Sequence, residues 1–451
     1  MNQSYMKEKP VFPLLMSMAL PMMLSMLVSA LYNIIDSFFV AKISEASMTA
    51  LSLVFPVQNL INAVSVGFAI GINSAVAFYL GAEKQGRADT AATAGILLNG
   101  LHGLLLMTAG LLLMPNFLQL FTNDPAVLEM GLQYSNIVLL FTLPNIIAIS
   151  FEKIFQAVGK MTVSMVSMIC GCVTNIILDP LMIFGIGFFP EMGIRGAAIA
   201  TGIGQTVSMV IYLIFYFRRP ISVKFRLLPG GVNRSLLFRL YAVGVPATLN
   251  MALPSLLVSV LNSVLSAYGS AYVLVLGAYY KLQTFLYLSA NGIVQGMRPL
   301  IGYNYGAGIY KRVRRLHSTG LAMILGIMLL GTALCLAAPA RLIALFTANQ
   351  DTIALGVTAI RIISAGFFVS GISVTVSGTL EGLGMGSPSL AISLCRYVLF
   401  IIPGALLLSR TMGATGVWCA FGISECLTAL VSAGIYRYVS QKRLRGEISG
   451  L

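Results

Sequence analysis

Two aspartates stand inside stretches of sequence that are otherwise apolar. Asp36 lies in LVSALYNIIDSFFVA and Asp179 in CVTNIILDPLMIFG. A carboxylate within a bilayer costs roughly 2–3 kcal/mol or more, so membrane proteins keep one there where it faces protein or water and has a function. Because both fall in the first half of the chain, they predict a single site for a cation or a proton.

Two further polar residues are expected to complete this site. Asn175 precedes Asp179 by four residues and therefore shares its helix face. Thr201, in the next predicted helix, lies at a comparable depth. Together the four side chains supply the oxygen atoms that Na⁺ prefers, or a hydrogen-bonded position for a proton. A purely structural polar cluster is the alternative interpretation.

No metal centre or catalytic set is expected. His102 and His317 fall in different halves of the chain, and all six cysteines lie inside predicted helices. Cysteines in such positions are typical of small buried apolar residues. The sequence also lacks GxxxxGK[ST], which argues against a pump driven by ATP.

The elements that position the site are predicted to be transmembrane helices. Of 451 residues, 58% are hydrophobic and only 9% charged, against roughly 25% charged in soluble proteins, and the mean hydropathy is +0.90. Apolar runs long enough to cross ~30 Å of hydrocarbon as helices recur throughout. We expect an all-α integral membrane protein with spans near 13–41, 46–79, 88–114, 126–157, 161–187, 193–217, 236–267, 271–304, 314–338, 352–382, 388–409 and 413–438.

The net charge of +14 is distributed unevenly between the two predicted sides of the membrane. Most Lys and Arg residues, Lys153 among them, fall in segments on the side of the termini. Only Lys42, Arg195, Arg341 and Arg410 fall on the other side. This bias is the positive-inside pattern and predicts that both termini are cytoplasmic. The basic residues are therefore expected to orient helices against lipid, and nucleic-acid binding is not expected.

The second half of the chain repeats the first. ALP ending at Pro21 matches GVP ending at Pro246, and LQLFTND at 118–124 matches IALFTAN at 343–349. These matches predict an amino-terminal lobe at 1–217, a basic cytoplasmic linker at 218–239 and a carboxy-terminal lobe at 240–451. Six spans per lobe make the repeats parallel, with a pseudo-two-fold axis along the membrane normal and a cavity between them. That arrangement is typical of alternating access.

The carboxy lobe lacks the aspartate pair. Asp36 falls on Asn262 in the repeat, and Asp179 falls on about Ile402. A different candidate polar cluster lies near mid-depth of the last spans: Lys281, Arg361, Arg396 and Glu425. Arg396 is expected to pair with Glu425 as a structural ion pair, whereas the other cations would line the cavity or repel protons.

Three segments carry a family resemblance that covers nearly the whole chain. ALPMMLSMLVSALYNIIDSFFVAKI, PLIGYNYGAG at 299–308, and NIILDPLMIFG with GAAIAT resemble the multidrug and toxic compound extrusion (MATE) family, in its MepA/DinF-like bacterial branch. The resemblance implies efflux of small, usually cationic amphipathic compounds, driven by inward H⁺ or Na⁺ and needing no cofactor. It also implies that Asp36, Asn175, Asp179 and Thr201 correspond to the family's amino-lobe cation site.

The sequence therefore predicts a secondary-active multidrug exporter, not an enzyme, that is monomeric and lies in the bacterial plasma (inner) membrane. One alternative is a flippase for lipid-linked precursors from the same superfamily, and another is a metabolite exporter of narrow specificity. An intramembrane enzyme is a weaker alternative, because we find neither a clustered nucleophile and base nor a metal set. A channel is also a weaker alternative, because two lobes around a cavity at the midplane would be an unusual architecture for one.

Overall fold

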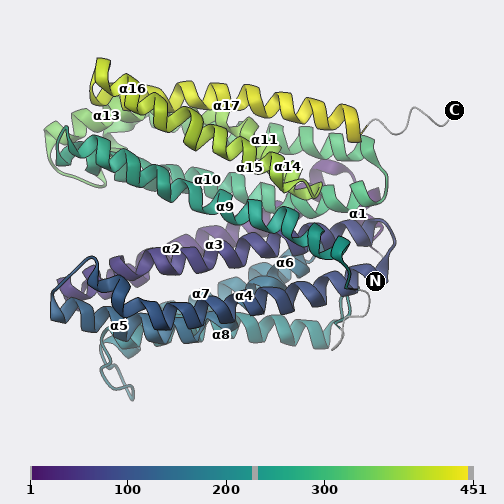
Figure 1. The fold of residues 1–451 in the computed structure, drawn as a ribbon, viewed down its shortest axis with the longest axis horizontal. Helices are drawn as coiled ribbons and strands as arrows, with labels where there is room; N and C mark the ends of the chain where they lie inside the picture. The colour runs from purple at the N-terminus through teal and green to yellow at the C-terminus, as the bar shows by residue number, and fades with distance from the viewer. Residues whose placement is uncertain (1–2, 226–231, 445–451) are drawn as a thin grey trace. The chain divides into compact units, whose positions relative to one another are not determined.

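The computed structural model describes residues 3–225 and 232–444, and this part of the chain folds into helices joined by short turns (Figure 1). Part of the predicted linker, residues 226–231, and the basic residue Arg445 lie outside the described residues. The helices are α1 Tyr5–Glu8, α2 Val11–Ala41, α3 Glu45–Gly81, α4 Gln85–Gln119, α5 Pro125–Leu140, α6 Thr142–Ala157, α7 Met161–Ile183, α8 Ile194–Arg218, α9 Arg234–Ser266, α10 Ser270–Gly306, α11 Tyr310–Ala337, α12 Pro339–Ala344, α13 Gln350–Ser364, α14 Phe367–Gly382, α15 Gly386–Leu394, the π-helix η1 Cys395–Ile401, α16 Ile402–Met412 and α17 Ala414–Arg443.

Most of the predicted spans correspond to single long helices. Within the described residues, nine helices are long and apolar enough to cross a membrane, counting 386–412 as one. Two bent pairs, α5 with α6 and α13 with α14, raise the number to eleven. The remaining predicted span, 271–304, corresponds to α10. This helix has 37 residues, and its apolar sequence is interrupted by tyrosines and by Lys281 and Arg298.

The duplication is visible in how corresponding helices begin and bend. Asp124 caps α5 by accepting a hydrogen bond from the Ala126 amide at 2.9 Å, and Asn349 caps α13 through the Asp351 amide at the same distance. Such side chains satisfy amides that a helix start leaves unpaired. Each capped helix is then followed by a bend, of 46° in the first half and 50° in the second.

The described chain divides into two compact units. Unit 1 contains Leu24–Thr248, and unit 2 contains Ser4–Met23 with Leu249–Leu451. Both divisions fall inside a helix, two residues after Pro21 in α2 and two residues after Pro246 in α9. Each of these helices therefore contributes its first part to one unit and the remainder to the other.

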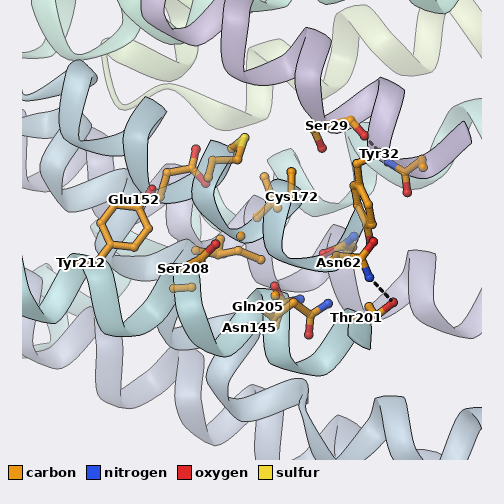
Figure 2. A pocket seen from close by; sticks show the side chains of 18 residues that line it. Ser29, Tyr32, Asn62, Asn145, Glu152, Cys172, Thr201, Gln205, Ser208 and Tyr212 are labelled. Carbon is orange, nitrogen blue, oxygen red and sulfur yellow. Dashed lines mark hydrogen bonds between the residues drawn. The ribbon is translucent and has the colours of Figure 1, made fainter. Parts of the chain in front are cut away.

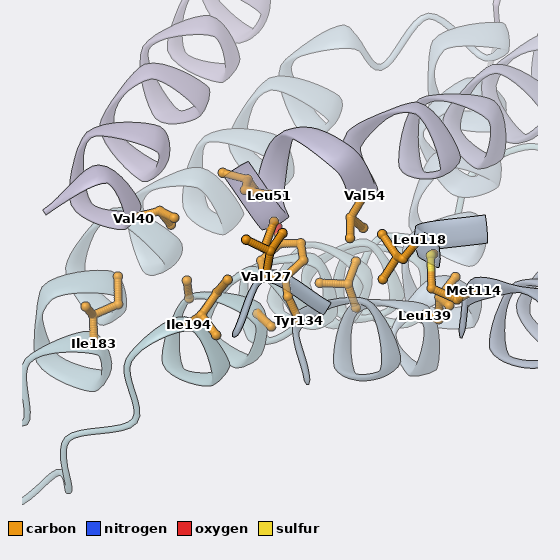
Figure 3. Close-up of a cluster of buried hydrophobic side chains, with 14 of the residues drawn as sticks. Val40, Leu51, Val54, Met114, Leu118, Val127, Tyr134, Leu139, Ile183 and Ile194 are labelled. Atoms are coloured by element: carbon orange, nitrogen blue, oxygen red, sulfur yellow. The ribbon is translucent and has the colours of Figure 1, made fainter. Parts of the chain in front are cut away.

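An apolar core in unit 1 supports the helices that carry the predicted site. Buried side chains from α2, α3, α4, α5, α7 and α8 pack together around Tyr134, Val54 and Leu118 (Figure 3). Nearby, α7 and α8 approach closely because Gly171 and Gly204 face each other. A Cβ on Gly171 would lie 2.6 Å from the carbonyl oxygen of Gly204. This close contact fixes the spacing between the helices that carry Asn175 and Thr201.

Candidate functional site

The structure brings the four predicted site residues together in unit 1. Asp36 comes from α2, Asn175 and Asp179 come from α7, Thr201 comes from α8, and all four are buried. The Asn175 amide donates to Asp179 Oδ1 at 3.3 Å and to Thr201 Oγ1 at 3.2 Å. The carboxyl groups of Asp36 and Asp179 lie close enough to each other to interact directly. Three separate helices thus converge on one cluster of oxygen atoms.

This cluster keeps oxygen atoms available. Asp36 Oδ1, Asn175 Oδ1 and Asp179 Oδ2 are buried and accept no hydrogen bond. Buried acceptors without a partner are costly, so such a group suggests a ligand that would satisfy them. A proton on one of two neighbouring carboxyl groups would let that group donate a hydrogen bond to the other. The arrangement therefore fits a bound proton, and its oxygen atoms also suit Na⁺.

Across the described residues, no group of three or more His, Cys, Asp and Glu side chains could hold a metal ion. The candidate site instead has a low charge. Its possible ligand atoms are the oxygens of two aspartates together with neutral amide and hydroxyl oxygens.

Two residues that the sequence did not point to extend this network. The Tyr134 hydroxyl in α5 lies beside the side chains of Thr201 and of Gln58 in α3. Tyr134 is also a buried member of the apolar core (Figure 3). A polar residue in a long apolar span is the only signal the sequence offers for either side chain, because no spacing connects α3 with α5.

The oxygen cluster adjoins a pocket of about 290 Å³ within unit 1. Asn175 and Thr201 belong both to the cluster and to the pocket wall. In Figure 2, Tyr32, Asn62 and Thr201 lie at one side of the pocket, and Glu152 and Tyr212 lie at the other. The wall is rich in amide and hydroxyl groups, which come from Ser29, Asn33, Asn62, Asn145, Asn175, Thr201, Gln205 and Ser208.

A third carboxylate of unit 1 lines this pocket. Glu152, in α6, forms an ion pair with Lys153 at 2.7 Å and accepts a hydrogen bond from the Gln156 amide at 2.7 Å. Lys153 was expected in a cytoplasmic segment, but it is buried within α6 and only 4% exposed. A buried cation needs a carboxylate partner, and Glu152 provides it.

In unit 2 the candidate polar cluster is only partly assembled. Arg396 Nε donates to Glu425 Oε1 at 2.9 Å, and its Nη2 contacts the same oxygen, so the expected ion pair is present. Arg396 Nη2 also donates to the Tyr287 hydroxyl at 3.0 Å. Lys281 and Arg361 do not join this pair, since both are exposed, and Lys281 lies over the ring of Phe346.

Known proteins match the chain over almost its full length. Multidrug export protein MepA of Staphylococcus aureus (strain MSSA476) is 25% identical over 450 residues, which is 99% of this chain and 98% of that protein. MepA of Staphylococcus haemolyticus (strain JCSC1435) is 25% identical over 433 residues, or 95% of this chain and 94% of its own length.

Solved structures show the same fold. A MOP superfamily transporter from Pyrococcus furiosus aligns with a TM-score of 0.91 at 23% identity, covering 98% of this chain and 99% of its own. A multidrug resistance MATE family transporter in an outward-facing conformation aligns with the same score and identity, covering 97% and 98%. These likenesses confirm the predicted fold of twelve helices in two halves.

The family model called MatE matches twice, at residues 21–181 and 246–407, which confirms the internal duplication. Together the matches cover well over half of the chain. This chain therefore belongs to the MatE family of membrane transporters.

Proposed function

We propose that this protein is a secondary-active exporter of small organic molecules, driven by the inward movement of H⁺ or Na⁺. The observation that carries the proposal is the shared wall of the two sites in unit 1. Asn175 donates hydrogen bonds to Asp179 of the buried carboxyl pair and to Thr201, and both Asn175 and Thr201 line the pocket. A ligand in the pocket and an ion on the carboxylates would therefore act on the same two side chains.

This sharing supplies a mechanism for exchange. Binding of the ion to Asp36 and Asp179 would compete with the hydrogen bond that the Asn175 amide donates to Asp179, and the hydrogen bond from Asn175 to Thr201 would change with it. The pocket wall would then lose the donor and acceptor arrangement that holds substrate. A ligand shifts a conformational equilibrium only through its different affinities for the two states, and this coupled network provides such a difference. We propose alternating access as the overall cycle.

The pocket favours cationic amphipathic substrates. Its wall carries Glu152 and adjoins the aspartate pair, while the ring of Tyr32 and the side chain of Met168 offer apolar surface. The name multidrug export protein, carried by the relatives from Staphylococcus, points in the same direction. A lipid-linked precursor flippase and a metabolite exporter of narrow specificity remain the alternatives against which this proposal is tested.

The proposal includes the topology expected from the sequence. The protein would act as a monomer in the bacterial plasma membrane, with both termini in the cytoplasm. Its lobes would run from 1 to 217 and from 240 to 451, joined by a cytoplasmic linker.

Ethidium efflux from proteoliposomes tests the proposal directly. Wild type, Asp36→Asn and the control Asp124→Asn would be compared at equal protein content, with pH and Na⁺ gradients imposed separately. Asp124 is an exposed helix cap outside the site, and asparagine caps helices as well as aspartate does, so the control makes the same chemical change without touching the carboxyl pair.

We expect wild type and Asp124→Asn to extrude the dye with one of the two gradients, and Asp36→Asn to lose at least nine tenths of that rate. The effective gradient identifies the coupling ion. Normal efflux by Asp36→Asn would refute the role of the carboxyl pair. No movement of ethidium by wild type would favour the flippase or the narrow metabolite exporter.

A further inference from the structure

The connection between α7 and α8, residues 184–193, presents apolar side chains at the surface of unit 1. Its sequence, FGIGFFPEMG, contains three phenylalanines and a single charged residue, Glu191. Phe188 is 89% exposed, and Ile186 is 50% exposed. The ring of Phe189 lies 4.3 Å from that of Phe188, measured between ring centres. Neighbouring apolar side chains on an exposed segment indicate a surface that contacts another protein or a membrane.

This connection has a defined shape. The Gly193 amide donates a hydrogen bond to the Ile183 carbonyl oxygen at 3.1 Å, which joins the two ends of the segment. Gly185 and Gly187 have φ angles of +67° and +76°, which residues with a side chain rarely adopt, and they turn the chain on either side of Ile186. The exposure of Ile186 therefore results from a folded turn and not from an irregular chain.

The apolar surface continues onto the adjoining helix. Val173, Ile177 and Phe184 are all exposed, and they are separated by four and then seven residues, so they lie on one face at the end of α7. Helix α7 is long and apolar enough to span the membrane, and the exposed face of a spanning helix meets lipid chains. This lipid-facing surface therefore leads through Phe184 into the connection.

The direction of the connection is that of a segment lying on a membrane. In Figure 1 it extends sideways from unit 1, across the direction of the helices, and not onward along them. Spanning helices run roughly along the membrane normal. A segment that leaves their ends sideways therefore lies roughly parallel to the membrane surface, at the boundary between headgroups and acyl chains.

The end of α2 beside this connection has the composition of a membrane interface. The ring of Phe39 in α2 contacts that of Phe184, with 6.3 Å between the ring centres. The neighbouring Phe38 is exposed, and the ammonium group of Lys42 lies 4.5 Å from the centre of its ring. Aromatic rings and lysines whose charge reaches the headgroups are typical of the ends of spanning helices. These residues place the connection at the depth of the lipid headgroups.

We propose that the connection between α7 and α8 is a membrane anchor, in which Ile186 and Phe188 insert into the lipid interface at the end of α7. Apolar side chains of such segments are buried by ~5–10 Å at the boundary between headgroups and acyl chains. Because α7 and α8 carry Asn175, Asp179 and Thr201, the anchor would hold that site at a fixed depth in the bilayer. The proposal rests on the spanning helices and holds whether or not the site couples to an ion.

Tryptophan fluorescence in proteoliposomes tests the anchor. Phe188→Trp places a fluorescent ring at the exposed tip, and wild type, whose single tryptophan Trp418 is buried, supplies the background emission to be subtracted. Asn123→Trp is the matched control. Asn123 is exposed in the turn between α4 and α5, which lies at the same membrane face because successive spans alternate in direction. Emission is quenched by acrylamide in the water phase, and by phospholipids brominated either near the headgroup or near the chain ends.

We expect Phe188→Trp to be quenched most by bromine near the headgroup, and at most about half as strongly by acrylamide as Asn123→Trp. Equal quenching of both variants by acrylamide, with none by brominated lipid, would place the connection in water and overturn the proposal. Protection of Phe188→Trp from both quenchers would show that protein covers the connection, which would overturn it as well. Ile186→Trp repeats the measurement at a second position, so a folding defect in one variant does not decide the result.

Discussion

Replacing Glu425 with glutamine should destabilise the protein strongly. Glu425 and Arg396 are both buried, and Arg396 places two of its nitrogens on the same carboxylate oxygen. Glutamine keeps the size of the side chain and one oxygen acceptor, but it removes the negative charge. The guanidinium of Arg396 would then remain in the interior with Tyr287 as its other polar partner.

The magnitude follows from the cost of leaving a buried charge unpaired. Removing one partner of a buried ion pair typically costs about 3–5 kcal/mol. For a unit of roughly 150–250 residues, each kcal/mol shifts the melting temperature by about 2–4 °C. A decrease of at least about 6 °C is therefore expected for Glu425→Gln. Replacing both partners by methionine should recover most of this loss, because a buried pair contributes little net stability over apolar residues of similar size.

Thermal unfolding of the purified protein in detergent measures the effect, together with the yield of folded protein and the rate of efflux per folded molecule. Glu129→Gln is the matched control, since Glu129 is exposed and its substitution should change stability by less than about 0.5 kcal/mol. We expect Glu425→Gln to lose yield and melting temperature more than specific efflux. Unchanged stability with abolished transport would refute a structural role for the pair.

Three further changes test unit 1. Tyr134→Phe removes the hydroxyl that contacts Thr201. It should destabilise the protein by about 1 kcal/mol in thermal unfolding and lower the rate of ethidium transport. An unchanged rate of transport would show that Tyr134 does not belong to the site. Gly171→Ala should lower the free energy of unfolding by about 1–3 kcal/mol, because the new Cβ would lie 2.6 Å from the carbonyl oxygen of Gly204. A variant that melts at the wild-type temperature would show that α7 and α8 can move apart to accept the methyl group. Glu152→Gln should raise the KM for a cationic dye more than for a neutral one, and an equal effect on both substrates would remove Glu152 from recognition.

The fold could be predicted from the sequence because its signals are long and repeated. Each apolar run had to cross a bilayer, and the duplication fixed the number of helices in each half. The bends could not be placed in the same way. Pro144 lacks an amide hydrogen and so favours the break between α5 and α6, yet the bend before α14 has no proline and lies at Gly366. The division of α2 and α9 between two units depends on packing, which leaves no local pattern.

The candidate site could be predicted only in part, for a physical reason. Asp36 and Asp179 are conspicuous because a carboxylate in apolar sequence is costly. Tyr134 and Gln58 are ordinary polar residues on other helices, and only the packing of five helices shows that they extend the network. The ion pair that Arg298 forms with Glu381 in unit 2 escaped notice because each residue lies near a helix end, where charged residues are common.

The two halves differ locally in the second half's π-helix η1, which carries Arg396. A π-helical turn takes up more residues than an α-helical turn, so it can accommodate an insertion without breaking the helix. The family-model matches begin at 21 and 246 and end at 181 and 407, so the match in the second half is longer by a single position. Aligned on the starts of the two matches, Asp179 falls on Gly404, and aligned on their ends it falls on Ala405, so neither alignment places a carboxylate there. The first half therefore carries a pair of buried aspartates, whereas the second half carries the ion pair of Arg396 with Glu425.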